Sequence, residues 1–204
     1  MTRLAVLVSG NGSNMQSIIS STKSGFLRGL ASVVLVVSNN PNAYAIERAK
    51  DENIKTVCIE RNNFINESSF NNVILYELQA AKVDFVCLAG YMRLVGHEII
   101  DAYHCRILNI HPSLLPKFGG KGMYGYHVHE AVVKAKEIKS GATVHFVEEE
   151  YDIGTIIIQQ DVQIFKNDTP QDVAKKVLEI EHKIYSKAIK KVIEVKNDIT
   201  LHKA

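Results

Sequence analysis

The chain of 204 residues contains only three cysteines, Cys58, Cys87 and Cys105, and no Cys-x-x-Cys pair. An odd number of cysteines argues against a disulfide framework, and their spacing does not fit a zinc knuckle. Each of the three lies among apolar residues in the sequence. We therefore expect buried thiols in a reducing compartment, and no metal site.

The sequence also lacks an excess of charge of one sign, because its formal net charge is +2. Such a small net charge provides no strong field for attracting nucleic acid or an anionic membrane. Lysine and arginine are spread along the chain apart from a small cluster at Lys187, Lys190 and Lys191. We interpret that cluster as the solvated face of a helix, and we expect neither a nucleic-acid partner nor a membrane partner.

Long apolar runs are absent as well, and none reaches the length of a membrane-spanning helix. The first apolar run, residues 4–8, is too short for the core of a signal peptide. These features predict a cytoplasmic protein. With 46% hydrophobic residues, the chain is long enough for one well-packed core, so we expect a single domain over residues 1–204.

Short buried runs alternate with helical patterns along the chain, which predicts an α/β fold with a mostly parallel central sheet and helices on both faces. No internal repeat interrupts this order. The expected strands cover residues 4–8, 31–37, 55–59, 83–89, 107–111, 142–147 and 155–160. One expected helix begins near Met15, and a second covers residues 43–52. Two more helices follow Asn66 and Thr169. The tail from Lys196 onward is expected to be peripheral.

A glycine-containing loop, Ser-Gly-Asn-Gly-Ser-Asn at residues 9–14, joins the first strand to the first helix. Glycine allows a ligand to approach the backbone, and free amides at a helix N-terminus favour an anion. Met15 stands where the dinucleotide motif Gly-x-Gly-x-x-Gly requires glycine, and the Walker lysine is missing. The loop therefore indicates a phosphomonoester site rather than NAD or ATP, with an ordinary strand-to-helix turn as the alternative.

The segment from Ile107 to Pro116 reads Ile-Leu-Asn-Ile-His-Pro-Ser-Leu-Leu-Pro. Asn109 and His111 are two residues apart, so in a strand they point to the same face, and Pro112 ends the strand beside them. An amide can donate a hydrogen bond to a developing oxyanion and an imidazole can move a proton near neutral pH. The pair suits attack on a carbonyl group, although a turn-forming asparagine and a packed histidine remain the alternative.

A carboxylate is expected to reach the same edge of the sheet from the loop at residues 148–154. Asp152 beside an imidazole would raise the pKa of the histidine and fix its tautomer. The three glutamates that precede it are expected to be solvated, and His145 is expected to be a satisfied interior histidine. Glu181 follows an apolar residue on the last helix, from where it could reach a ligand.

Two further loops are candidates for binding. Arg93 follows the fourth strand in an apolar loop, where it makes either a surface salt bridge or part of a pocket for a flat apolar ligand. The segment from Lys117 to Gly125 contains too many glycines for a helix or strand, and it is expected to be a mobile flap. His127 and His129 do not share a helix face, so we assign them structural or surface roles rather than metal binding.

Taken together, these motifs closely resemble phosphoribosylglycinamide formyltransferases, the folate-dependent enzymes of purine synthesis, over almost the whole chain. The likeness rests on the loop at 9–14, Leu-Ala-Gly-Tyr-Met-Arg at 88–93, the segment at 108–116, Gly-Ala-Thr-Val-His-Phe-Val at 141–147, and Asp152. It implies a Rossmann-like formyltransferase fold. It also implies transfer of a formyl group from the co-substrate 10-formyltetrahydrofolate to the amine of glycinamide ribonucleotide, by direct attack through a tetrahedral intermediate.

The resemblance also implies roles for individual residues. The catalytic residues would be Asn109, His111 and Asp152. The ribonucleotide would bind to Gly12, Ser13, Asn14 and Glu181. The folate pocket would be lined by Met92, Arg93, Leu94, Val95, Asn109, Glu148, Glu149, Glu150, Tyr151 and Asp152.

The sequence departs from the family in two places. Family members often carry a folate-contacting arginine after the third strand, where this chain has Phe-Ile-Asn-Glu at 64–67, and the segment at 119–126 is unusually rich in glycine. Other candidate functions are formylation of methionyl-tRNA, hydrolysis of the folate donor, a nicotinamide-dependent oxidoreductase and a phosphate-ester sensor. The oligomeric state is left open by the sequence, and a homodimer is one of the states it allows.

Overall fold

The computed structural model describes residues 1–201, with the backbone alone for residues 197–201. The elements, in chain order, are β1 Thr2–Val8, α1 Ser13–Ser24, β2 Ala31–Ser38, α2 Tyr44–Asp51, β3 Thr56–Cys58, the 3₁₀ turn η1 Arg61–Asn63, α3 Glu67–Ala80, β4 Phe85–Leu88, α4 His97–Ala102, β5 Ile107–His111, α5 Tyr126–Lys134, β6 Lys139–Phe146, β7 Ile156–Gln163 and α6 Pro170–Leu201.

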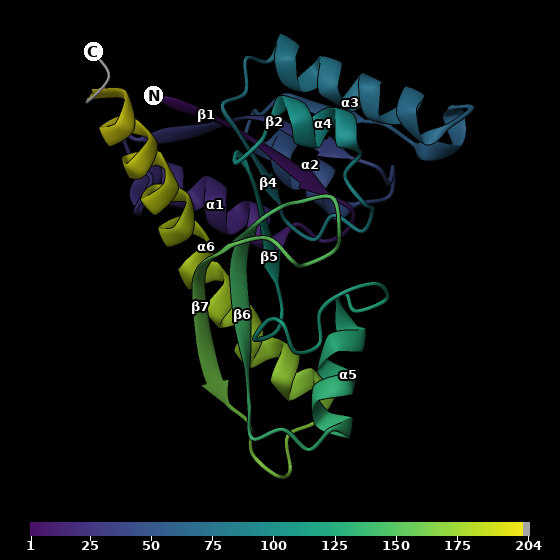
Figure 1. The fold of residues 1–204 in the computed structure, drawn as a ribbon, viewed down its shortest axis with the longest axis vertical. Coiled ribbons are helices and arrows are strands. Elements are labelled where there is room, and N and C mark those ends of the chain that lie inside the picture. The colour runs from purple at the N-terminus through teal and green to yellow at the C-terminus, as the bar shows by residue number, and fades with distance from the viewer. Residues whose placement is uncertain (202–204) are drawn as a thin grey trace.

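All seven strands form one sheet in the order β3-β2-β1-β4-β5-β6-β7. The first five strands in this order pair in parallel, whereas β6 pairs antiparallel with both β5 and β7. The mostly parallel sheet predicted from the alternation of strands and helices is confirmed. The antiparallel part extends the sheet downward in Figure 1 and carries the loop with Asp152 back toward β5.

Helices cover both faces of the sheet, as predicted (Figure 1). On one face, buried residues of β1, β4 and β5 pack with α1, α2, α5 and the long helix α6. On the other face, a second core joins the sheet to α3 and α4. The central strands β1, β4 and β5 are therefore buried on both sides, which explains their continuous apolar sequences.

A local sequence signal explains where α3 begins. Asn66 caps α3, because its side chain accepts from the amide of Ser69 and the Ser69 hydroxyl accepts in return from the amide of Asn66. The apolar stripe predicted for this helix is buried at Phe70, Ile74 and Leu78. Val73 is an exception, since it is 37% exposed.

Three expectations concerned peripheral features: the burial of the cysteines, the tail from Lys196 and the lack of a membrane-spanning helix. Only Cys87 is buried, whereas Cys58 is exposed at the end of β3 and Cys105 is exposed between α4 and β5, so the expectation of three buried thiols was wrong. Helix α6 continues past Lys196 to Leu201, and residues 202–204 lie outside the described part of the chain. None of the described helices is both long and apolar enough to cross a membrane.

The hydroxyl of Tyr185 ties α6 to the centre of the sheet. The side chain is 1% exposed, and its hydroxyl lies 2.9 Å from the carbonyl oxygen of Leu88 in β4 and 3.0 Å from that of Leu108 in β5. Strands β4 and β5 end at the same edge of the sheet, where Gly90 and Pro112 follow them. The tyrosine therefore fixes α6 against the strands that carry the candidate site.

We expect Tyr185→Phe to lower the free energy of unfolding by about 1–2 kcal/mol, because the variant removes the only donor of this buried bridge while keeping its volume. Urea unfolding followed by circular dichroism measures the change. Tyr76→Phe is the matched control, since Tyr76 is 67% exposed. Equal stability of the Tyr185→Phe variant and the parent protein would contradict the structural role of the hydroxyl.

Candidate active site

A cavity of about 490 Å³ lies at the carboxyl ends of β4 and β5. This is the edge of an open α/β sheet where ligands usually bind. Its wall is formed by β5, the N-terminus of α1, the loop after β4, the glycine-rich segment, the loop between β6 and β7, and one face of α6.

Strand β5 supplies Asn109 and His111 from the same face, as the two-residue spacing predicted. Leu108 and Ile110 belong to the core that packs on α1 and α6. His111 is 4% exposed, and its Nε2 lies 2.8 Å from the carbonyl oxygen of Phe118. Because a carbonyl can only accept, Nε2 carries a proton in this arrangement, and Nδ1 is left to face the next group.

That group is Asp152, which the structure places beside His111 as expected. Its Oδ2 lies 3.4 Å from Nδ1 of His111 and accepts a 2.9 Å hydrogen bond from the backbone amide of Gly120. Its Oδ1 faces the Nδ2 of Asn109 at 3.5 Å and the Nε2 of His145 at 3.6 Å. One carboxylate therefore contacts both candidate residues of β5 and the glycine-rich segment.

The electrostatics of this cluster favour a charged carboxylate. Burial alone would raise the pKa of Asp152, but His145, the charge of His111 and the Gly120 amide together lower it. Burial lowers the pKa of His111, although Asp152 and the Phe118 carbonyl favour its protonated form. The free protein therefore keeps His111 mostly neutral at pH 7, beside a carboxylate that can stabilise a second proton on Nδ1.

His145 belongs to the same cluster, which the sequence alone did not indicate. Its Nδ1 lies 2.7 Å from the carbonyl oxygen of Phe146, so its Nε2 can accept from the Nδ2 of Asn109 at 3.1 Å. The side chain is buried and satisfied, as expected, but its side-chain partner is Asn109, and Asp152 lies beside it. The informative signal is the register, because His145 is the residue opposite Asn109 in the antiparallel pairing of β5 with β6.

The other end of the cavity is the N-terminus of α1. Gly12 precedes this helix in a left-handed conformation, with φ of 78°, and a side chain there would meet Ala45 at 2.6 Å. Gly12 itself does not line the cavity, whereas Ser13 and Asn14 do. Helix α1 has no acidic residue in its first turn, so its positive end is available to an anion.

Glu181 lies opposite that helix terminus, on α6. The residue is 7% exposed, lines the cavity and accepts a 2.9 Å hydrogen bond from the Nδ2 of Asn14. Burial raises the pKa of Glu181 to about 7, and the Asn14 hydrogen bond opposes this shift only partly. The carboxyl group is therefore close to half protonated at neutral pH, and a ligand that donates hydrogen bonds would favour its charged form.

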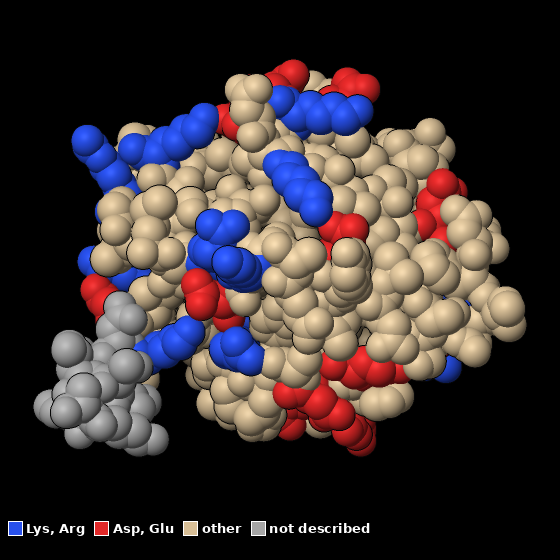
Figure 2. Space-filling view, turned by 90° about the horizontal axis from the view of Figure 1, so that it is seen from above, with Lys and Arg blue, Asp and Glu red and all other residues tan. Residues whose placement is uncertain are grey.

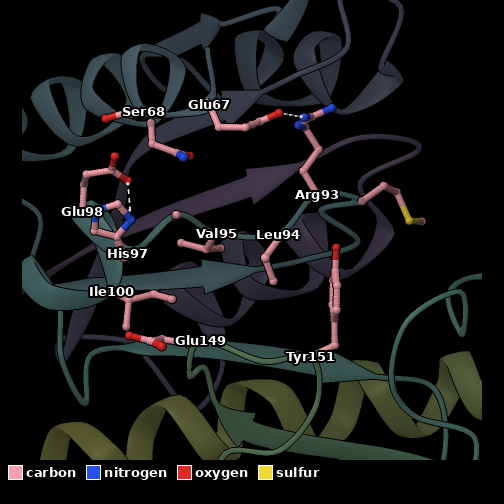
Figure 3. Close-up of a pocket in the computed structure, with 13 residues that line it drawn as sticks. Glu67, Ser68, Arg93, Leu94, Val95, His97, Glu98, Ile100, Glu149 and Tyr151 are labelled. Carbon is pink, nitrogen blue, oxygen red and sulfur yellow. Dashed lines mark hydrogen bonds and ion pairs between the residues drawn. The ribbon is translucent and has the colours of Figure 1, made fainter.

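The loop after β4 forms an apolar wall with Met92, Leu94 and Val95. These residues and Arg93 also line an adjoining cavity of about 770 Å³ between this loop, α3 and α4 (Figure 3). Of the acidic loop, Glu148, Glu150, Tyr151 and Asp152 line the first cavity, and Glu149 and Tyr151 line the second. Arg93 fits both predictions made for it, since it pairs with Glu67 at 2.8 Å and lines both cavities.

The glycine-rich segment closes the remaining side of the cavity without forming a helix or strand before α5. Whether it moves as a flap stays a prediction. His127 is exposed, as expected for a surface role, but His129 is 7% exposed and lines the cavity. Among the side chains that the structure describes, those of residues 1–196, no three of His, Cys, Asp or Glu are arranged to hold a metal ion.

Comparison with known proteins agrees with this geometry. The family model described as formyl transferase matches residues 2–189. The chain is 37% identical to the phosphoribosylglycinamide formyltransferase of Bacillus subtilis, with 97% of both chains covered. It is 42% identical to the chloroplastic phosphoribosylglycinamide formyltransferase of Arabidopsis thaliana, covering 94% of this chain but only 65% of that protein. The crystal structure of glycinamide ribonucleotide transformylase 1 from Symbiobacterium toebii superposes with a TM-score of 0.89 at 38% identity, covering 95% of this chain and 88% of that one.

The buried carboxyl group at position 181 yields a prediction for stability. The pKa of Glu181 is about 7 in the folded protein and 4.5 in the unfolded chain, so the folded state holds the carboxyl proton more tightly. The stability that comes from this protonation is therefore lost as the pH rises from 4.5 through 7. Glu181→Gln keeps an acceptor for Asn14 and has no such loss. In urea unfolding, the free energy of unfolding of the variant minus that of the parent protein should rise by about 2–3 kcal/mol from pH 5 to pH 8. A pH-independent difference would show that Glu181 is ionised throughout.

Proposed function

Because the chain belongs to the formyl transferase family, we propose that it transfers the formyl group of 10-formyltetrahydrofolate to the amine of glycinamide ribonucleotide, a step of purine biosynthesis. The observation that carries this proposal is the meeting of Asn109, His111 and Asp152 on one wall of a cavity that ends at the N-terminus of α1. The first group of residues suits a reacting carbonyl carbon, and the helix terminus suits a phosphate.

The catalytic roles follow from the hydrogen bonds of the free protein. The contact from Nδ2 of Asn109 to Asp152 is long, at 3.5 Å, so this hydrogen can turn toward a developing oxyanion. A proton gained on Nδ1 of His111 would be stabilised by Asp152 and would place positive charge near that oxyanion. Asn109 and His111 thus stabilise the tetrahedral intermediate, and Asp152 supports both.

The chemistry needs no enzyme-bound acyl group. The amine nitrogen bonds to the formyl carbon, the bond from that carbon to the folate nitrogen breaks, and the amine proton passes to the leaving nitrogen, which yields tetrahydrofolate. Nδ1 of His111 faces the charged carboxylate of Asp152, so His111 can hold a proton during this exchange. His145 accepts a hydrogen bond from Asn109 and so keeps Asn109 in place as a positioning residue.

The two substrates divide the cavity between them in this proposal. The phosphate of the ribonucleotide binds at the start of α1, to Ser13 and Asn14, with Gly12 shaping the turn, and Glu181 accepts hydrogen bonds from the rest of that substrate. The flat pterin ring of the folate lies against Met92, Leu94 and Val95. Arg93 and the loop at 148–152 form the entrance on the folate side, with Glu149 in the adjoining cavity.

Formylation of methionyl-tRNA is the competing reaction with the same donor. The face shown in Figure 2 carries basic and acidic side chains side by side, which does not favour a polyanion, and the formal net charge is +2. The cytoplasmic location and single-domain organisation expected from the sequence stay predictions, and so does a choice between monomer and homodimer.

The proposed function is tested by following tetrahydrofolate release spectroscopically from 10-formyltetrahydrofolate, with and without glycinamide ribonucleotide. We expect release only when the ribonucleotide is present. Release without it would indicate a hydrolase, and release that requires methionyl-tRNA would replace the proposed acceptor. No release with either acceptor would contradict the proposal.

We expect His111→Asn to lower kcat roughly 100- to 1000-fold, because the variant removes the group that carries positive charge beside the oxyanion. Ribonucleotide binding, measured by calorimetry, should change little, since the phosphate site lies on α1. His104→Asn is the control, because that histidine is exposed and follows α4, outside the cavity. Parent-like turnover of His111→Asn would end the assignment.

A further inference from the structure

Two arginines converge on a single carboxylate oxygen at the rim of the larger cavity. The Nε of Arg61 and the Nη2 of Arg93 each lie 2.8 Å from the Oε1 of Glu67. Figure 3 shows the pair of Arg93 and Glu67 spanning the upper side of this cavity. The two guanidinium groups thus form an anion site that a residue of the same chain occupies.

The three groups are not held equally well. Arg93 stacks over the ring of Phe70 at 5.4 Å, and Arg61 donates a 2.7 Å hydrogen bond to the carbonyl of Phe64, so each arginine has an anchor besides Glu67. The side chain of Glu67 is 60% exposed, compared with 24% for Arg61 and 32% for Arg93. An exposed carboxylate in a surface ion pair is held weakly, so Glu67 is the exchangeable member.

Arg93 also retains an unused donor. Its Nε is buried and has no hydrogen-bond partner among the described residues. A guanidinium group binds a carboxylate best through two parallel hydrogen bonds, whereas Glu67 uses only Nη2 of Arg93. A ligand carboxylate that replaced Glu67 could therefore gain a contact that Glu67 does not make.

The proposed folate substrate would bring such a carboxylate to this place. The two cavities share Met92, Arg93, Leu94, Val95 and Tyr151, so a ligand whose ring lies in the smaller cavity can extend into the larger one. The far end of a folate is one or more glutamates. Among the described residues, Arg93 is the only lysine or arginine that lines the larger cavity, whereas Glu98 and Glu149 line it with negative charge.

We propose that Glu67 is a specificity-determining residue, which competes with the glutamate tail of the formyl donor for Arg61 and Arg93 and so weakens the preference of this chain for donors with anionic tails. This inference rests on the proposed function, because it takes the donor to be a folate. A tail carboxylate must displace Glu67 before it reaches the arginines. Donors with and without a charged tail should then bind the parent protein with similar strength.

The test compares three donors: 10-formyltetrahydrofolate with one glutamate, the same donor with three glutamates, and an analogue whose glutamate is replaced by a neutral methylamide. For Glu67→Gln, we expect KM to fall about three- to tenfold for the glutamate donors and to stay unchanged for the methylamide, with kcat unchanged. Adding Arg93→Gln should abolish this gain. Equilibrium dissociation constants for the corresponding tetrahydrofolates, measured by fluorescence, should change in the same way.

The fold should tolerate the substitution, because the Asn66–Ser69 capping box begins α3 without Glu67. Glu77→Gln is the matched control on the same helix, since Glu77 pairs with Lys55 at 2.7 Å and does not line the larger cavity. Unchanged or weaker binding of the glutamate donors by Glu67→Gln would overturn the inference and make Glu67 a support for Arg93. If the parent protein used none of the three donors, the proposed function itself would fail.

Discussion

The carboxylate of Asp152 is the group on which the arrangement of the candidate site depends. Asp152 lies in the loop that joins the antiparallel strands β6 and β7, and its backbone has a left-handed conformation, with φ of 59°. A residue other than glycine holds such a conformation only where its surroundings stabilise it. Here Asn109 and the Gly120 amide donate hydrogen bonds to the carboxylate, so groups that Asp152 organises also hold Asp152 in place.

The two ends of the cavity depend on different parts of the fold. The end that holds Asn109, His111 and Asp152 combines a parallel strand with the antiparallel hairpin, whereas the end at α1 needs only the first strand-to-helix turn and one contact from α6. The long loops between them supply the apolar wall and the acidic rim. This division explains how one cavity can combine a buried cluster of polar side chains with a helix terminus that suits a charged group.

Periodicity and turn chemistry were sufficient for the parts of the site that lie on one segment. The shared face of Asn109 and His111, the stop at Pro112 and the turn at Gly12 all follow from local rules. His145 could not be assigned in this way, because its role depends on which residue it opposes in the neighbouring strand. The exposed Cys58 and Cys105 were misjudged for a related reason, since burial is decided by elements far away in the sequence.

Helix α6 holds Glu181 and Tyr185 one turn apart, so one face of this helix reaches both the cavity and the carbonyl groups of β4 and β5. A rotation or slide of α6 that moved the carboxyl group would also pull on the middle of the sheet. Under the proposed function, the chain therefore has little freedom to fit a longer or shorter formyl acceptor by shifting this helix as a unit. Redesign for a different acceptor is better directed at the side chains of α1 and α5, which can change without disturbing that bridge.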